Sequence, residues 1–361
     1  MSFTLGNSIK MEVTGASHAP KITVSLSEIP KGIELDMWQI EVLLDRRAGG
    51  KSVYTTPRKE KDKPVILSGI ENGVTTGDAI CAEFINANAK SSDYNNLKFV
   101  PRPSHADYAA YVKYDGKIDL SGGGFFSGRM TLPMCFAGAV CKQILEQKGI
   151  LIGAHMLSVG DIKDDAFDPV EEDLEVVPTE GLPVLNSEAA AKMEELMVKT
   201  SNDMDSIGGV IECKAVGLPI GLGDPIYDSV ESRISYGMFG IPAIKGIEFG
   251  SGFDITKMNG SRANDSFAMK DGKVVCTTNH SGGIQGGITN GMPLIFSVAV
   301  KPTPSIFKEQ KSVDLISGKE VDLKIQGRHD SCIVPRAVPC VEAMCAIILY
   351  DILKEFENEK V

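Results

Sequence analysis

The chain has 361 residues, of which 43% are hydrophobic and 24% are charged, proportions typical of soluble globular proteins. A net charge of −11 argues against a general nucleic-acid-binding surface. No apolar run reaches the length of about 18 residues that predicts a membrane span, and the first residues lack the basic and apolar regions of a signal peptide. The eight scattered cysteines include no Cys-x-x-Cys pair, which argues against structural zinc and a disulfide framework. We therefore expect a cytoplasmic protein with reduced thiols and no structural metal.

The first third of the chain is predicted to alternate strands with one helix. Asp36 can cap a helix that ends at Arg46 and Arg47, where positive charge favours the helix dipole. A loop further on carries Arg102, His105 and Asp107 within six residues. The strands are expected at residues 9–13, 22–26, 65–70 and 79–85.

A glycine-rich loop at residues 121–129 precedes a helix that is predicted from about residue 133 to residue 148. Backbone N–H groups at such a junction can bind an anion. The loop lacks the Lys-Ser/Thr ending of a P-loop and does not match the dinucleotide-binding fingerprint. By itself it is weak evidence for a phosphate site.

The rest of the chain continues the same alternation, and the pattern favours one layered domain of sheets and helices. His155 lies inside an apolar strand and is interpreted as a packed histidine. A second glycine-rich run, residues 279–291, allows close backbone approach to a ligand. Pro339 is expected to begin a buried helix that covers residues 341–353. The other expected elements are strands at 151–159, 210–216 and 294–300 and helices at 187–199 and 228–236.

Arginines concentrate near glycines and prolines. Only nine of the 37 basic residues are arginines, and six of these lie in or beside such stretches. They can form a local anion site, or they can cap helices and pair with nearby carboxylates. The residue types alone leave both interpretations open, and the same holds for the triplet Arg328, His329 and Asp330. The six arginines are Arg46, Arg47, Arg102, Arg129, Arg328 and Arg336.

Taken together, these stretches resemble the chorismate synthase family. The resemblance runs nearly end to end, and the order of its blocks makes it specific. It implies an α/β (α+β) fold, a single domain over residues 1–361 with a β-α-β sandwich, and a homotetramer. The blocks are residues 15–18, 46–47, 54–56, 102–107, 122–129, 279–291, 301–305, 327–330 and 342–344.

The resemblance implies conversion of 5-enolpyruvylshikimate 3-phosphate into chorismate and phosphate by an anti 1,4-elimination that requires reduced FMN. It assigns His18 as the acid near the departing phosphate, His105 as the group that protonates or steadies the reduced flavin, and Asp330 as the eventual base, which acts through flavin N5. The implied substrate-binding residues are Ser17, Arg46, Arg47, Arg102, Arg129 and Arg328. The implied FMN-binding residues are Phe125, Phe126, Ser127, Ala263, Asn264, Gly286, Lys301, Pro302, Thr303, Pro304, Ser305 and Arg328.

The chain also departs from the family pattern. Phe125 and Phe126 replace an Arg-Ser pair, and Ala48 and Gly49 stand where a third arginine and a proline are common. Val53 replaces a basic residue associated with nicotinamide contact, so an external flavin reductant is expected rather than an intrinsic NADPH-dependent reductase. A degenerate homologue that binds flavin or phosphate without turnover is the alternative, and an unrelated flavin oxidoreductase is a third. His280 and His329 receive no role.

Overall fold

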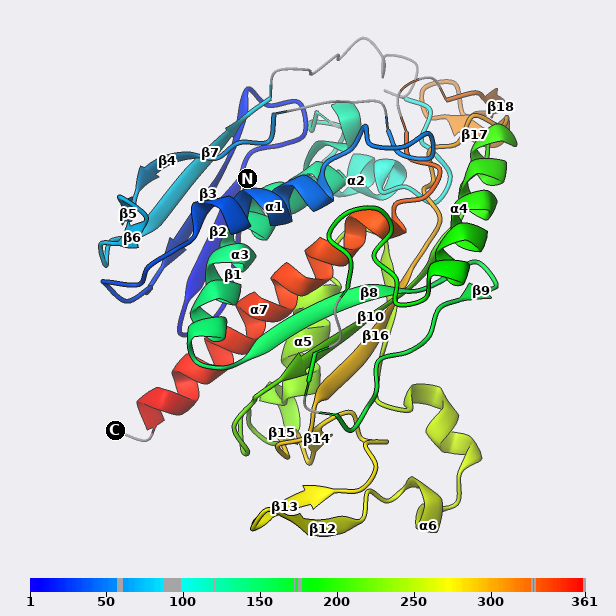
Figure 1. Cartoon of the computed structure of the whole chain (residues 1–361). Helices are drawn as coiled ribbons and strands as arrows, with labels where there is room; N and C mark the ends of the chain where they lie inside the picture. The colour runs from blue at the N-terminus through cyan, green and yellow to red at the C-terminus, as the bar shows by residue number, and fades with distance from the viewer. Residues whose placement is uncertain are drawn as a thin grey trace.

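The structure is a computed structural model that describes residues 1–56, 61–86, 99–119, 121–171, 173–174, 177–325, 327 and 329–359, with Ser121 described by its backbone alone. Its described part contains two five-stranded sheets, which face each other across a layer of helices (Figure 1). This is the β-α-β sandwich that the resemblance implied, and the predicted fold class is confirmed.

The first sheet has the strand order β1-β2-β3-β7-β4, and each pair of neighbours is antiparallel. Ile22, Val24 and Leu26 alternate with polar residues on β3 and are buried, as the sequence pattern predicted. This face packs on the helix layer. The strands are β1 (Ser2–Leu5), β2 (Lys10–Thr14), β3 (Lys21–Ser27), β4 (Val65–Ser68) and β7 (Ile80–Ile85).

The second sheet has the strand order β11-β16-β10-β8-β9 and is also antiparallel throughout. Its central strands are buried along most of their length, since helices cover one face and loops cover part of the other. The strands are β8 (Leu151–Val159), β9 (Ile162–Lys163), β10 (Gly209–Val216), β11 (Ile244–Phe249) and β16 (Leu294–Val300).

Four helices form the middle layer: α1 (Met37–Arg47), α3 (Thr131–Gln147), α5 (Val230–Met238) and α7 (Val334–Glu359). Asp36 caps α1 as expected, since its carboxylate accepts hydrogen bonds from the backbone N–H groups of Trp38 and Gln39. Helices α3 and α7 lie in close contact. A Cβ atom at Gly138 would come within 2.4 Å of the Cβ atom of Ala343. Only glycine at this position allows the two helices to approach so closely.

Helix α7 begins earlier than the sequence predicted. It starts at Val334, so Pro339 lies inside the helix rather than at its first turn. Val334, Val338 and Val341 are fully buried at helical spacing. Burial of this apolar stripe offsets the hydrogen bond that the proline removes from the backbone.

The remaining helices and hairpins lie outside the two five-stranded sheets and the middle layer of helices. Helix α2 (Asp107–Lys113) was not predicted, because Ala106 precedes it and offers no capping side chain. The other helices are α4 (Ser187–Asn202) and α6 (Gly260–Ala263), with short 3-10 turns at Ser121–Phe126, Gly128–Met130, Ile226–Asp228 and Gly252–Lys257. The two-stranded hairpins are β5–β6 (Ile70–Glu71, Val74–Thr75), β12–β13 (Phe267–Lys270, Lys273–Cys276), β14–β15 (Ile284–Gln285, Ile288–Thr289) and β17–β18 (Gln310–Asp314, Lys319–Leu323).

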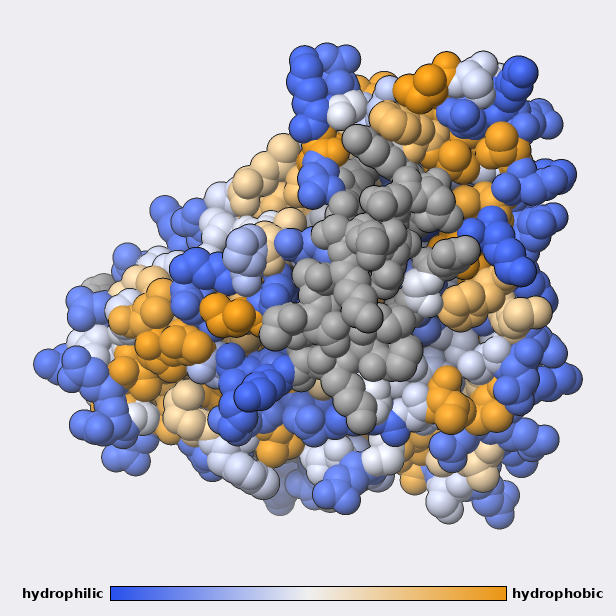
Figure 2. Space-filling model, turned by 90° about the horizontal axis from the view of Figure 1, so that it is seen from above, coloured by the Kyte–Doolittle hydropathy of each residue, from blue (hydrophilic) through white to orange (hydrophobic). Residues whose placement is uncertain are grey.

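The surface is mixed in character. Seen from above, hydrophobic residues lie in separate groups among hydrophilic ones (Figure 2). In the part of the chain that the structure describes, no helix combines the length and the apolar composition needed to cross a membrane.

Candidate active site

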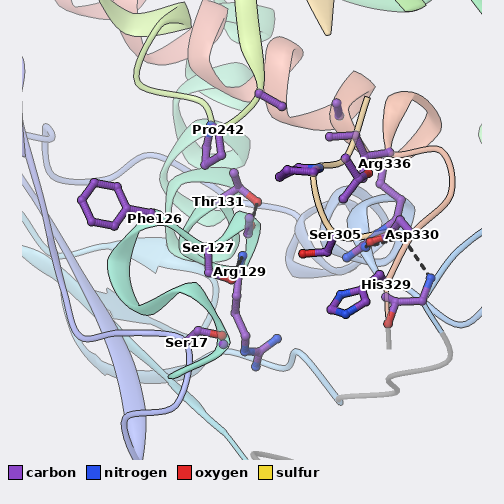
Figure 3. A pocket seen from close by; sticks show the side chains of 18 of the residues that line it. Ser17, Phe126, Ser127, Arg129, Thr131, Pro242, Ser305, His329, Asp330 and Arg336 are labelled. Carbon is purple, nitrogen blue, oxygen red and sulfur yellow. Dashed lines mark hydrogen bonds and ion pairs between the residues drawn. The ribbon is translucent and has the colours of Figure 1, made fainter. Parts of the chain in front are cut away.

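A cavity of about 410 Å³ opens where loops meet the first turns of α3 and α7. This volume lies in the range of small-molecule sites. Ser17, Ser127 and Arg129 lie on one side of it, and His329 and Asp330 lie on the other (Figure 3). The cavity therefore combines segments that are far apart in the sequence.

The cavity is cationic although the protein is acidic. Among the described residues, five cationic side chains and two carboxylates line it, whereas the whole chain carries a net charge of −11. Such a local excess attracts an anionic ligand. No group of three or more His, Cys, Asp or Glu residues in the described ranges is arranged to hold a metal ion. The charged lining residues are Arg47, Arg102, Arg129, Lys301, Arg336, Asp62 and Asp330.

The three consecutive glycines of the 121–129 loop allow two histidines to approach the backbone. Gly122, Gly123 and Gly124 all have positive φ angles, of 62°, 86° and 56°. A Cβ atom at Gly122 would lie 1.9 Å from Cε1 of His18, and one at Gly123 would lie 3.5 Å from Nε2 of His105. A side chain at Gly122 would displace His18, so this glycine is required by the geometry of the site.

His105 is oriented by a buried ion pair. Arg102 donates from Nε and Nη2 to the two carboxylate oxygens of Asp107, at 2.7 and 2.8 Å. The Nδ1 atom of His105 lies 2.6 Å from the same carboxylate and 3.1 Å from Nη2 of Arg102. Burial alone would raise the pKa of Asp107, but hydrogen bonds from Arg102 and His105 outweigh it and hold that pKa well below its ordinary value. The ionised carboxylate of Asp107 accepts a hydrogen bond from Nδ1–H of His105, so that Nε2 of His105 is left to act on a ligand.

Arg47 and Arg129 share one carboxylate and keep further donors for a ligand. Nη1 of Arg129 donates to Asp62 at 2.9 Å, and Nη2 of Arg47 lies 3.7 Å from the other oxygen of Asp62. Both arginines are buried, with 3% and 7% of their surface exposed. Among the described residues, Nε and Nη1 of Arg47 and Nη2 of Arg129 have no hydrogen-bond partner. Burial lowers the pKa of Arg47, although Asp62 opposes this. A buried guanidinium with unpaired donors is costly unless an anion completes it.

Among the described residues, the side chain that holds Asp330 is that of Arg336. Nη1 of Arg336 lies 2.8 and 2.7 Å from the two oxygens of Asp330, and the backbone N–H of Thr56 donates to Oδ1 at 3.0 Å. Nε of Arg336 donates to the carbonyl oxygen of Arg47. These contacts fix the Asp330 carboxylate at the cavity wall.

The structure brings most of the predicted site residues to this cavity. Those that line it are Ser17, His18, Arg47, Arg102, His105, Phe126, Ser127, Arg129, Lys301, Thr303, Pro304, Ser305 and Asp330. Arg328, predicted to bind both substrate and flavin, lies outside the described residues. His329 lines the cavity, whereas His280 bonds to Ser251 elsewhere.

Six predicted site residues lie elsewhere in this chain. Arg46 pairs through both terminal nitrogens with buried Glu342, at 2.6 and 3.0 Å. Consecutive residues of a helix point about 100° apart, and here Arg47 faces the cavity whereas Arg46 faces Glu342 of α7. The ring of Phe125 packs against Phe3 and Phe126 instead of lining the cavity. The other four are Pro302, which is exposed, and Ala263, Asn264 and Gly286, which lie near α6 and β14, at the opposite end of the molecule in Figure 1 from the first turn of α7.

Several residues of the site received no specific role from the sequence. Asp107 had a signal, since it follows Arg102 and His105 in the second Arg-His-Asp cluster. Arg336 was named among the arginines of a possible anion site, and Thr56 lies in the resembling block 54–56. Asp62 and Cys340 reach the cavity only through tertiary folding, and no local pattern marked them.

A cationic cavity with two histidines, one of them oriented by a carboxylate, and a fixed Asp330 carboxylate defines an enzyme that acts on a small anionic substrate. Comparisons with known proteins agree. The family model described as chorismate synthase matches residues 9–353, so the chain belongs to the chorismate synthase family, whose reaction is the last step of the shikimate pathway.

Named relatives support this membership over the full length. The chain is 40% identical to the chorismate synthase of Lancefieldella parvula over 100% of this chain and 98% of the relative. It is 42% identical to that of Thermococcus gammatolerans over 96% of both chains, and 44% identical to that of Methanococcoides burtonii over 96% of this chain and 94% of the relative. A crystal structure of chorismate synthase superposes with a TM-score of 0.74 at 28% identity, over 98% of this chain and 93% of that chain.

Proposed function

We propose that the chain converts 5-enolpyruvylshikimate 3-phosphate into chorismate and phosphate, as a carbon–oxygen lyase that requires reduced FMN. One observation carries the proposal. Buried Arg47 and Arg129 keep donors that have no partner among the described residues, and these arginines line the same cavity as His18, His105 and Asp330. The cavity thus combines anion recognition with groups able to move protons, which argues against the binding-only alternative.

The arginines account for substrate binding. The substrate carries two carboxylates and a phosphate, and the donors of Arg47 and Arg129 that lack partners among the described residues suit such oxyanions. Arg102 contributes differently, since Asp107 and Ser305 already occupy its donors. Its role in this proposal is to hold His105 and the 301–305 loop in place.

Two histidines are suited to proton transfer. Asp107 fixes the ring of His105, so that Nε2 is available on the side of Gly123. His18 lies against Gly122 in the same cavity and is the proposed acid that protonates the departing phosphate. A protonated phosphate is the better leaving group, and an acid in this position contributes roughly 10²- to 10⁴-fold to the rate.

Asp330 is the proposed proton acceptor. Arg336 and the backbone N–H of Thr56 hold this carboxylate at the cavity wall, where it is placed to take the ring proton of the substrate. The same contacts fix its direction. A base held this way loses little entropy as it reacts.

The residues of the cavity fit a flavin. Oγ1 of Thr303 is buried without a partner among the described residues. Ser127, Lys301 and Phe126 also line the cavity. Together they offer hydroxyl and ammonium groups for the ribityl phosphate of FMN and an aromatic side chain for its ring system. Reduced FMN, when bound, supplies an electron-rich ring that eases loss of the phosphate. The protein supplies the binding and the proton transfers.

The wider expectations are a homotetramer in the cytoplasm and an external flavin reductant. Ala263, Asn264 and Gly286 do not line the cavity of their own chain, so a flavin contact by them would require a second copy. Phe267 and Met269 on β12 are exposed by 69% and 68%, which supports association through this hairpin. All eight cysteines, which lie in the described ranges, are free thiols, as a reducing compartment would leave them.

An anaerobic assay tests the proposed function. The purified chain, the enolpyruvyl substrate and dithionite-reduced FMN should give equal amounts of phosphate and chorismate, and omission of FMN should abolish both. Binding of substrate and FMN without any phosphate release would instead establish the binding-only alternative.

A further inference from the structure

Two buried thiols meet at the wall of the cavity. Cys135 on α3 and Cys340 on α7 have their Sγ atoms 3.7 Å apart. Cys135 is 0% exposed, whereas Cys340 also lines the cavity. A small oxidant that enters the cavity can therefore reach Cys340, and Cys135 lies directly behind it.

The helix contact holds the two thiols together. Cys135 and Cys340 lie three residues before Gly138 and Ala343, which form the closest contact between α3 and α7. A covalent bond needs the sulfur atoms about 1.7 Å closer than they are. Side-chain rotation and a slight movement of either helix can supply this distance.

The two thiols differ in reactivity. The Sγ atom of Cys135 donates a hydrogen bond to that of Cys340, and buried Arg47 provides positive charge nearby. The hydrogen bond from Cys135, together with Arg47, lowers the pKa of the Cys340 thiol below its ordinary value although burial opposes this. Burial raises the pKa of Cys135. Cys340 is thus the nucleophile of the pair, and Cys135 is placed to react second.

We propose that Cys135 and Cys340 form a peroxide-sensitive thiol pair that converts reversibly into a disulfide at the wall of the cavity. The Cys340 thiolate attacks one oxygen of hydrogen peroxide, the O–O bond breaks, and the leaving hydroxide takes a proton to become water. The sulfur of Cys135 then attacks the Cys340 sulfenic acid, the S–O bond breaks, and a second water leaves. Two thiols are oxidised, and one peroxide is reduced to two waters.

The disulfide would act on turnover through Arg336. Sγ of Cys340 donates to the carbonyl oxygen of Arg336 at 3.4 Å, and Arg336 holds Asp330. Pulling Cys340 toward α3 breaks this hydrogen bond and displaces the first turns of α7. This consequence rests on the proposed function, in which an oxygen-sensitive reduced flavin is a local source of peroxide. The disulfide itself does not depend on that function.

A second cysteine pair provides a matched control. Cys213 on β10 and Cys345 on α7 are also buried neighbours, since Cys345 contributes to the raised pKa of the Cys213 thiol, but neither lines the cavity. Burial raises the pKa of the Cys213 thiol well above its ordinary value. Cys213 and Cys345 are close together, but peroxide in the cavity cannot reach them and no low thiol pKa makes Cys213 reactive. Peroxide should therefore leave this pair reduced.

The test is to treat the whole protein with a few equivalents of hydrogen peroxide, quench it in acid, alkylate the free thiols and map disulfides by mass spectrometry. The expected product is a Cys135–Cys340 cross-link, with Cys213 and Cys345 alkylated. In Cys135→Ser, the cross-link should be replaced by a sulfenic acid at Cys340 that dimedone traps. Equal oxidation of both pairs, or no reaction at Cys340, would overturn the proposal.

An activity measurement then separates the two claims. Under the anaerobic assay, the cross-linked wild-type protein should turn over at least several-fold more slowly than the reduced protein, and dithiothreitol should restore it. A cross-link that forms without any change in turnover would remove the regulatory consequence. An inactive reduced protein that still forms the cross-link would count against the proposed function alone.

Discussion

A single carboxylate, that of Asp107, organises one side of the cavity. It pairs with Arg102 through two hydrogen bonds and contacts Nδ1 of His105, so it sets the tautomer of the histidine and the position of the arginine together. Asp107 touches no ligand in this account. It is a positioning residue, and its effect should appear in the behaviour of His105.

Asp107→Asn should lower kcat by about 10- to 100-fold, as for other residues that orient a functional histidine. The folded-state pKa of Asp107 is depressed, so its contribution is present above the unfolded value and is lost only as pH falls far below it. The pH dependence of the wild-type kcat should therefore show no change near neutral pH that is due to protonation of Asp107. In the variant, the loss should appear in kcat rather than in KM, because the His105 ring is no longer held while Arg47 and Arg129 keep their donors for the substrate. A lower Tm with unchanged kcat would make Asp107 merely structural.

Asp330→Asn separates proton transfer from structure. Asparagine keeps the shape and can still accept hydrogen bonds from Thr56, but it cannot take a proton. We expect kcat to fall by about 10²-fold or more while KM changes little. Stopped-flow absorbance of the anaerobic reaction should show slow decay of the flavin signal. Asp254→Asn, which changes an exposed aspartate far from the cavity lining, is the control and should leave kcat unchanged.

At the scale of elements, the contact of α1, α3 and α7 rests on a buried charge cluster. Glu342 of α7 accepts from Arg46 of α1 and from Lys142 of α3. Burial alone would raise the pKa of Glu342, but Lys142 and Arg46 lower it from 4.5 to about 2. A shift of this size corresponds to a contribution to stability of about 3 kcal/mol.

Glu342→Gln should therefore lower the free energy of unfolding by about 3 kcal/mol and leave two cations poorly paired. Because the folded pKa lies below the unfolded one, this stabilisation is complete above about pH 5 and is lost as the pH falls from about 4.5 toward 2. Urea unfolding at several pH values should show the full difference between the proteins at pH 7 and less than half of it near pH 3. A constant difference at all pH values would contradict the charge-based explanation.

Most elements could be predicted from the sequence, because their signals are local. The alternation of Ile22, Val24 and Leu26 and the cap at Asp36 both identified elements that the structure contains. Helix α2 lacked a cap signal, and the start of α7 depended on burial of Val334, which only tertiary packing provides. Local sequence signals therefore predicted the presence of helices and strands better than they predicted the residues at which these elements begin.

The candidate site was predictable only in part, for a similar reason. Motif blocks identified His18, His105 and Asp330, all of which line one cavity. They did not reveal that Arg46 turns away to Glu342, or that Arg336 holds Asp330. Such pairings depend on side-chain direction and on contacts between distant segments, which sequence order does not encode locally.

At the scale of the whole molecule, the exposed hairpin β12–β13 is the expected contact between copies. The double substitution Phe267→Ser and Met269→Ser removes two exposed hydrophobic side chains without altering the core. Sedimentation velocity should show a tetramer for the wild type and smaller species for the double variant. Ile316→Ser, at another exposed hydrophobic position, is the control and should remain tetrameric. A tetrameric double variant would place the interface elsewhere.

The claim that buried arginine donors receive the anionic substrate can be tested most directly at Arg129. Its Nη2 atom is buried without a partner among the described residues, whereas Lys192 on α4 is an exposed cation outside the cavity lining. The measurement is KM for the enolpyruvyl substrate, from anaerobic phosphate release with reduced FMN, in Arg129→Gln and Lys192→Gln. We predict an increase of about 10-fold or more for Arg129→Gln, since a charge-assisted hydrogen bond is lost, and wild-type values for Lys192→Gln. Unchanged kinetics in Arg129→Gln would contradict the assignment of this cavity as the substrate site.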